Sequence, residues 1–277
     1  MPEGPEIRRA ADRVQRAVAG KVAERVEFLF PDLQCYGPQL EGRVVTHVET
    51  RGKAMLTHFD CGLSVYSHNQ LYGRWYVQRA GTFPRTGRSL RFAVHNETHS
   101  ALLYSASEIQ VLETGRVDEH PFLAKLGPDL LAPTLDEKRL RAQIADPRFA
   151  RRPLHALLLD QAFVAGVGNY LRSEILFQAK LHPLRRPKEL SATERRRLAR
   201  AVLTIGRRAY ETGGITNDPR RAKRLMKEGL RRGQARHHVF TRTNRPCWTC
   251  GTRVQRKDWG QRKLFFCPRC QPEVADT

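Results

Sequence analysis

Four cysteines near the C-terminal end constrain the fold of this chain more than any other feature. They form two Cys-x-x-Cys pairs, Cys247 with Cys250 and Cys267 with Cys270, separated by sixteen residues. Two such pairs can place four thiolates around a tetrahedral zinc ion. The spacing predicts one structural Zn²⁺ ion, and the simplest interpretation is that the metal only staples a small fold.

The residues around these cysteines have strand character at 239–243, 252–255 and 263–266, which predicts a zinc ribbon with a hairpin tip near 259–262. The ribbon is also unusually basic. Because so many cations on so small a unit are suited to contacting phosphates, we expect it to bind nucleic acid. These cations are Arg253, Arg256, Lys257, Arg262, Lys263 and Arg269.

The charge of the whole chain supports the same partner. Its 49 Lys and Arg oppose 28 Asp and Glu, and 30 of these basic residues, against 11 acidic ones, lie in 145–277. A surplus of this size favours a polyanion. There is no signal peptide, lipidation motif or long apolar run, so nucleic acid is favoured over a membrane. The cysteine usage indicates metal rather than disulfides, and hence a reducing cytoplasm.

Hydrophobic periodicity divides the chain into parts. Apolar residues from Ile7 to Val18 recur at helical spacing and Gly20 can end that helix, while 22–112 holds short β-rich runs typical of an antiparallel sandwich or barrel. Helical patterns follow at 136–145, 154–163, 169–179 and 191–210. The Gly-, Lys- and Arg-rich segment 213–236 is expected to be an exposed loop rather than a packed element.

The predicted fold class is therefore α+β and multidomain. We expect an N-terminal helix with a β-sandwich in residues 1–115, a helical domain in 130–236 and the zinc ribbon in 237–271.

Two helical patterns meet at a Gly-interrupted turn over residues 160–170. Gly168 frees the backbone there and Asn169 can cap the next helix, whose exposed amides could hold a DNA phosphate. Taken alone, the turn is better explained as a simple helix–helix connection with Asn169 as its cap, since such caps are common.

The N-terminus has reactive potential. Removal of Met1 would expose Pro2 as a secondary amine that is partly unprotonated at neutral pH, with Glu3 beside it for proton transfer. Taken alone, the same residues fit an ordinary helix start, where proline and acidic residues are favoured.

These motifs, together with Ser67-His68-Asn69-Gln70-Leu71-Tyr72-Gly73 and Arg51-Gly52-Lys53-Ala54, occur in an order that resembles the formamidopyrimidine-DNA glycosylase and endonuclease VIII family. The resemblance is closest to bacterial endonuclease VIII and covers nearly the whole chain. It implies a helix–two-turn–helix domain. It also implies a flipped nucleotide, attack of Pro2 on the sugar C1′, and proton transfer by Glu3.

By the same resemblance, Lys53 is the proton donor for β-elimination, and Arg262 grips a phosphate and serves δ-elimination. A lysine in such a turn is otherwise most often a solvated hairpin charge. Gln70, Leu71 and Tyr72 match a loop that fills the space left by the flipped nucleotide. On their own these three residues look like a turn with one core leucine.

The resemblance assigns DNA contacts to Asn169 and Lys125. Lys125 stands where relatives often have arginine, so the charge is kept and the bidentate geometry is lost. The Gln-Leu-Tyr form favours oxidised pyrimidines.

The chain is thus expected to be a base-excision-repair DNA glycosylase and AP lyase, acting as a monomer on damaged DNA in the bacterial cytoplasm at the nucleoid. The alternatives are an enzyme that prefers oxidised purines, or a non-catalytic nucleic-acid-binding protein on the same scaffold, against which Pro2, Glu3 and Lys53 argue.

Overall fold

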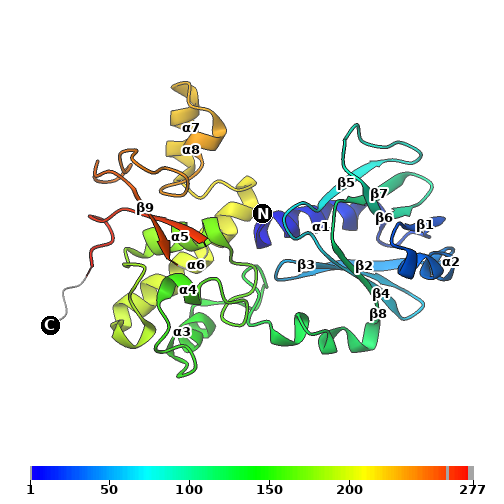
Figure 1. Ribbon diagram of the computed structural model, residues 1–277, viewed down its shortest axis with the longest axis horizontal. Coiled ribbons are helices and arrows are strands. Elements are labelled where there is room, and N and C mark those ends of the chain that lie inside the picture. Colours follow the sequence, from blue (N-terminus) through cyan, green and yellow to red (C-terminus); the bar gives the residue numbers. More distant parts are fainter. Residues whose placement is uncertain (1, 260–261, 274–277) are drawn as a thin grey trace. The chain divides into compact units, whose positions relative to one another are not determined.

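The computed structural model describes residues 2–259 and 262–273 of the chain. It divides into two compact units, Met1–Lys125 and Leu126–Thr277, coloured blue to green and green to red in Figure 1. Each unit has its own hydrophobic core.

The first unit begins with helix α1 (Gly4–Val18), as the periodicity predicts. Glu3 stands at its N-cap, and the Glu6 carboxylate accepts a hydrogen bond of 3.0 Å from the Glu3 backbone N–H. One face of the helix, including Ile7 and Val14, is buried. Gly20 follows with φ 73°, a conformation that glycine adopts readily, so the chain turns there.

Two antiparallel sheets in the described part of this unit share one core, which confirms the predicted sandwich. Their strand orders are β1-β6-β7-β5 and β2-β3-β4-β8. The strands are β1 (Arg25–Phe28), β2 (Val45–Arg51), β3 (Ala54–Phe59), β4 (Leu63–His68), β5 (Arg74–Arg79), β6 (Leu90–His95), β7 (His99–Tyr104) and β8 (Glu108–Glu113), with α2 (Gly37–Leu40), η1 (Pro31–Tyr36), η2 (Thr114–Glu119) and η3 (Leu123–Lys125) between or after them.

In the second unit, α3 (Glu137–Ala145), α5 (Asn169–Ala179) and α6 (Ala192–Thr212) match three predicted helices. The helix predicted at 154–163 is wrong in length, since α4 covers only Leu154–Leu157. The turn after α4 is held by Gln161, whose amide donates to Leu159 O and Val167 O and accepts from the Gly166 N–H at 2.9–3.0 Å. The short 3-10 helix η4 (Pro187–Glu189) precedes α6.

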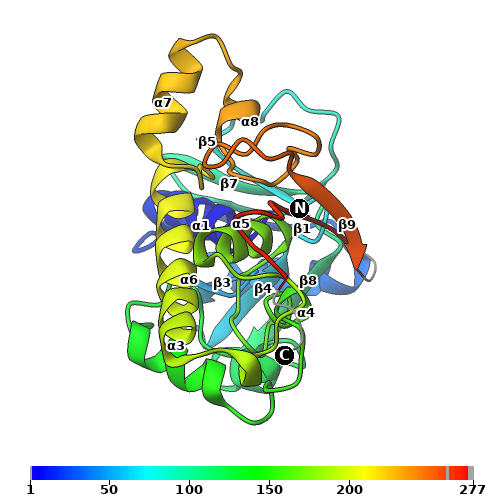
Figure 2. The same cartoon turned by 90° about the vertical axis from the view of Figure 1, so that its left-hand side faces the viewer.

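The prediction of an unpacked loop over 213–236 is also wrong. This segment contains α7 (Pro219–Lys227) and α8 (Arg232–Ala235), which lie side by side at the end of the unit away from α3 (Figures 1 and 2). Composition misled because a few small apolar side chains suffice to pack these short helices: Ala222, Leu225 and Ala235 are buried.

The C-terminal hairpin of β9 (Gln255–Trp259) and β10 (Arg262–Phe266) confirms part of the predicted ribbon. Residues 239–243 are not a strand but part of a turn, and the second predicted strand begins only at Gln255. Residues 260 and 261 of the predicted tip lie outside the described residues. None of the helices in the described part of the chain combines the length and apolar character needed to cross a lipid bilayer.

Candidate active site and metal centre

Pro2 and Glu3, at the start of α1, differ in how deeply they are buried. Pro2 is half-buried, whereas Glu3 is only 3% exposed. A carboxylic acid is rarely buried this deeply unless it has a specific partner or task. Glu3 is therefore more than one of the surface acids that favour a helix N-terminus, although its place as N-cap agrees with that simpler explanation too.

Lys53 lies in the two-residue turn between β2 and β3, where Gly52 adopts φ 62°. Such tight hairpins need positive φ at their first residue, and glycine supplies it without strain. Lys53 is only 8% exposed, so the interpretation of Lys53 as a solvated hairpin charge is wrong. A buried ammonium group on a rigid turn is held in position for a specific contact.

The segment between β4 and β5, which we call the wedge loop (residues 69–73), presents apolar groups to solvent. Leu71 is 59% and Tyr72 69% exposed, so the interpretation of a turn with one core leucine is wrong. Gly73 closes the loop by donating to Asn69 O at 2.7 Å, and a Cβ on Gly73 would come within 2.6 Å of the Asn69 backbone. Glycine is required there, since the loop could not close as tightly with any larger residue.

A hydrogen-bond network orders the base of the wedge loop. Gln70, at φ 47°, donates its backbone N–H to His68 Nδ1 at 3.1 Å and its side-chain amide to a Glu108 oxygen at 2.7 Å. The second Glu108 oxygen accepts from the Tyr66 hydroxyl at 3.2 Å. Burial raises the pKa of Tyr66, and the Glu108 charge adds to the effect, so this hydroxyl remains a donor.

Sheet register brings these groups to one end of the β2-β3-β4-β8 sheet. Ala54, next to Lys53, is opposite His68, and His68 is opposite Glu108. Burial lowers the pKa of His68; the Lys53 charge acts in the same direction and Glu108 opposes it. Lys53 therefore lies close enough to the wedge loop to act on its supporting histidine.

In the second unit Asn169 is not the helix cap that its sequence position suggests. Gly168 is the N-cap of α5, and the Asn169 side chain instead donates to Lys263 O at 3.0 Å and accepts from Arg172 at 2.6 Å. Asn169 thus joins the start of α5 to strand β10, which begins with the exposed Arg262. Lys125, in η3 of the first unit, is exposed.

Arg172 was not singled out from the sequence. It is 1% exposed, and its guanidinium donates to His155 O at 3.1 Å, Lys263 O at 3.1 Å and Arg262 O at 3.5 Å as well as to Asn169. A buried arginine with several fixed acceptors makes a rigid joint. It connects the helix start to the strand that carries Arg262.

Glu174 is a second charged residue inside α5 that was missed. Fully buried, it accepts from the backbone N–H groups of 238, 239 and 240 at 2.8–2.9 Å and from the Thr216 hydroxyl at 2.6 Å. Burial alone would raise the pKa of Glu174, but His237, His238 and these hydrogen bonds lower it. A carboxylate is thereby kept ionised beneath the loop that leads into the ribbon.

The signal for both missed residues was available in the sequence. Arg172 and Glu174 stand in the largely apolar run from Tyr170 to Phe177, and α5 proves to be buried on nearly all sides. Charged residues within such a run must be paired. Glu108 had no comparable signal, because its role depends on strand register.

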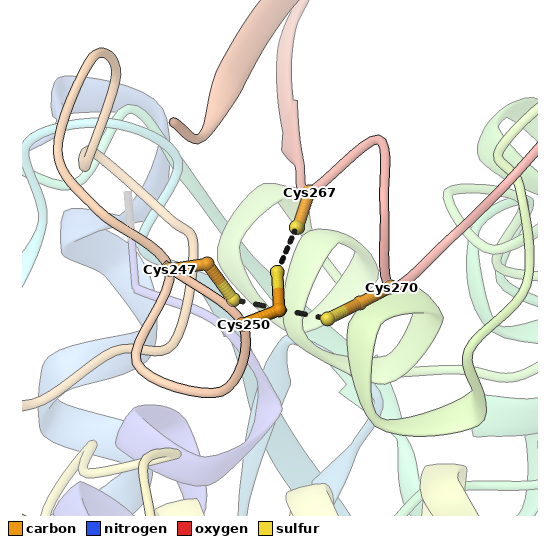
Figure 3. Close-up of side chains that lie close together, drawn as sticks. All are labelled: Cys247, Cys250, Cys267 and Cys270. Carbon is orange, nitrogen blue, oxygen red and sulfur yellow. Dashed lines mark hydrogen bonds between the residues drawn. The ribbon is translucent and has the colours of Figure 1, made fainter. Parts of the chain in front are cut away.

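The four cysteine thiols converge as Figure 3 shows, with all four sulfur atoms within 4.8 Å of one another. The Cys250–Cys267 and Cys247–Cys270 sulfur pairs are 3.4 and 3.9 Å apart. Tetrahedral zinc with Zn–S bonds of about 2.3 Å requires sulfur atoms about 3.8 Å apart, so the group fits this metal. Burial opposes ionisation of Cys250, but hydrogen bonds from Thr252 and the neighbouring thiols lower its pKa to about 6.

The fold and these sites were compared with known proteins. The N-terminal domain of formamidopyrimidine-DNA glycosylase matches residues 1–106, and the H2TH domain of the same enzyme matches residues 126–221. Among solved structures, Lactococcus lactis formamidopyrimidine-DNA glycosylase bound to DNA with an AP site has a TM-score of 0.79 at 21% identity, covering 98% of this chain and 100% of that one. The structure of MutM with DNA containing carbocyclic 8-oxo-G has a TM-score of 0.80 at 22% identity over the same shares of the two chains. These likenesses establish the fold.

The class of protein is thus a DNA glycosylase with an N-terminal β-sandwich unit and a helix–two-turn–helix unit. The chain belongs to the formamidopyrimidine-DNA glycosylase family. Endonuclease 8 of Escherichia coli O17:K52:H18 is 46% identical, and that of Klebsiella pneumoniae 45%, over 98% of this chain and 100% of each relative. The activity is accordingly that of a base-excision-repair DNA glycosylase and AP lyase acting on oxidised bases.

Proposed function

We propose that the mature chain, with Met1 removed, uses the Pro2 amine as its nucleophile. The nitrogen attacks the sugar C1′, the glycosidic bond breaks, and the oxidised base leaves with the electron pair and takes up the proton that the amine loses. Glu3 protonates the ring oxygen as the sugar opens, which leaves an iminium that joins Pro2 to C1′. The burial of Glu3 supports this, because a carboxyl group rarely lies this deep in a protein without a specific partner or task.

Lys53 and Arg262 serve strand cleavage in this proposal. The iminium acidifies the C2′ protons. A solvent base removes one of them, the C–H electron pair forms a double bond as the 3′ phosphate leaves in β-elimination, and Lys53 donates a proton to that phosphate. Arg262 contacts a phosphate and assists δ-elimination, in which the 5′ phosphate leaves. The buried position of Lys53 and the joint from Arg172 to the backbone of Arg262 both support fixed roles.

The partner is damaged DNA, which the proteins of similar fold named above also bind. Leu71 and Tyr72 insert where the flipped nucleotide was, and the wedge loop is exposed as this requires. The Gln70 side chain enters the base stack beside these two residues. Asn169 and Lys125 contact the DNA backbone. The domains that do this work are 1–115, 130–236 and 237–271, and the enzyme acts as a monomer at the bacterial nucleoid.

The favoured substrates are oxidised pyrimidines. The Gln-Leu-Tyr sequence of the wedge loop and the endonuclease 8 relatives support this preference. A preference for oxidised purines is the second candidate, since a protein of similar fold is described in complex with DNA containing 8-oxo-G.

One zinc ion completes the ribbon, held by Cys247, Cys250, Cys267 and Cys270. Zinc bound to four thiolates has no open position, so it supplies folding stability and takes no part in the chemistry. The sulfur geometry described above supports zinc as the metal.

The observation that carries this proposal is the pairing of a half-buried Pro2 with a fully buried Glu3 at the start of α1. Borohydride should trap the mature protein covalently on DNA with thymine glycol or an abasic site. Pro2→Gly, or blocking of the amine by a retained Met1, should reduce trapping at least a hundredfold because a secondary amine forms the iminium more readily than the groups that remain.

Pro5→Ala is the matched control, since Pro5 also lies at the helix start but is buried and has no free amine. Equal loss in both variants would assign Pro2 to helix initiation, and absence of any adduct with the mature wild type would refute the nucleophile. Product gels with thymine glycol, 8-oxoguanine and abasic DNA then report lesion class and elimination chemistry together.

A further inference from the structure

Residues 217–236, which we call the basic lobe, form a segment whose first and last residues are hydrogen-bonded to each other. Asn217 donates its side-chain amide to Ala235 O at 2.8 Å, and its backbone N–H bonds to Arg236 O at 3.0 Å. Thr216 beside it is anchored to the buried Glu174. The two ends of the lobe are therefore fixed to α5, although the lobe itself has only a small apolar interior.

Helix α7 in this lobe has a face made of cations. Arg220, Lys223, Arg224 and Lys227 stand at positions i, i+3, i+4 and i+7, and all four are exposed. Residues at this spacing share one side of a helix. Ala222 and Leu225 occupy the opposite side and are buried.

This arrangement costs the isolated protein stability, because like charges three and four residues apart repel each other. Among the ion pairs in the described part of the chain, only the exposed pair between Arg224 and Glu228, at 3.6 Å, relieves this repulsion. Exposed pairs of this kind contribute little. A polyanion along the face would neutralise the repulsion.

We propose that this face of α7 is a docking surface for the sugar–phosphate backbone of duplex DNA. This rests on the proposed function only in its choice of DNA as the polyanion. From Arg220 to Lys227 the helix rises about 10 Å. Over that length B-DNA carries roughly six phosphate charges, about three of them on the nearer strand. Four cations match this density.

Duplex DNA fits better than an acidic protein surface. Protein interfaces bury an apolar or aromatic centre, whereas the exposed residues of α7 and α8 are Arg, Lys, Gln, Gly and Pro. A surface of charges without apolar anchors is typical of sequence-independent phosphate binding.

The test is a variant with Arg220→Gln, Lys223→Gln, Arg224→Gln and Lys227→Gln, which keeps helix-forming side chains. Binding to undamaged and damaged duplexes is measured from 50 to 200 mM salt. The log–log slope should become less steep by about 2 to 4, because each lost contact accounts for about 0.9. Affinity at 100 mM salt should fall about tenfold or more on both duplexes, while single-turnover excision at saturating enzyme stays the same.

A control variant removes four exposed cations elsewhere in the second unit, Lys138→Gln, Arg139→Gln, Arg141→Gln and Arg151→Gln. The same slope change in both variants would show a general charge effect and overturn the proposal. So would an unchanged slope, or a loss confined to lesion-containing DNA, which would make α7 part of lesion recognition. Circular dichroism confirms folding, and trapping of the wild type tests the proposed function separately.

Discussion

At the scale of single residues, the exposed fraction of a side chain decides between competing interpretations of the same residue. Lys53 is buried in a hairpin turn and Leu71 is exposed at a loop tip, the reverse of what their residue types usually do. Each inversion costs stability in the free protein. A protein can keep such an unfavourable position where binding of a ligand offsets the lost free energy. These two positions therefore indicate function more strongly than their motifs do.

Glu108 gives a prediction at this scale. Its carboxylate holds Gln70, so Glu108→Ala should leave the wedge loop less ordered and weaken binding to lesion-containing duplex about threefold to tenfold. The excision rate at saturation should not change. Fluorescence of 2-aminopurine opposite the lesion would report insertion of the loop directly.

Glu113→Ala at the other end of β8 is the control, and Glu108→Gln should retain part of the effect. If both alanine variants behave alike, or if the saturated rate falls with Glu108→Ala, Glu108 does not position the wedge loop.

At the scale of elements, α5 is the organising helix of the second unit. Its two buried charges face different segments, with Arg172 bonded to β10 and Glu174 bonded to residues 238–240. A helix with one polar stripe could not do this, since it must be buried on most sides to reach both segments. Removing either charge would leave several buried donors or acceptors unpaired.

His238 gives a prediction about pH. Burial lowers the pKa of His237 and His238 to about 4, although Glu174 opposes the shift. The unfolded chain binds these protons near pH 6.5, so between pH 6.5 and 4 it holds more protons than the folded state. Stability therefore falls as the pH drops through this window.

His238→Phe should flatten this dependence, because the ring stacks on Phe177 at 4.9 Å and its buried nitrogens show no hydrogen-bond partner among the described residues. Thermal midpoints at pH 7 and pH 4.5, with zinc content checked at each, would measure it. A variant whose midpoint falls as steeply as that of the wild type would refute the assignment to His238.

At the scale of the whole molecule, the positive charge and the cysteine cluster are concentrated in one unit. Residues 126–277 carry 33 basic and 14 acidic side chains, against 16 and 14 in residues 1–125. The first unit holds the residues proposed for excision, and the second supplies most of the positive potential. Affinity for DNA and rate of chemistry should accordingly respond to different mutations.

Removal of the metal gives a prediction at this scale. The apolar cluster of the ribbon is small, with Val239, Val254 and Phe265 at its centre, so we expect that it does not hold the fold without the proposed zinc ion. Chelation, or Cys270→Ser, should lower the thermal midpoint and weaken DNA binding at least tenfold, and added Zn²⁺ should restore the chelated protein. Metal analysis should find one zinc per chain; fully active protein without zinc would contradict this.

The sequence by itself determined the cysteine cluster, the first helix, the sandwich and most of the helical domain. These follow from local periods and spacings, which act over a few residues and need no knowledge of what lies opposite. Pro2 and Glu3 could likewise be identified from the local sequence as candidate site residues. Asn169 was mistaken for a cap for the same reason, because asparagine at a helix start is locally favourable in that role.

Only the tertiary structure decided which candidate residues are buried and which are brought together by strand register. The Gln70–Glu108 contact and the Arg172 joint link residues 17 to 94 positions apart in the chain. The burial of Lys53 and the packing of α7 depend on tertiary contacts that composition does not show. Local patterns cannot carry this information, because the free energy of a buried charge is set by the partners that folding brings to it.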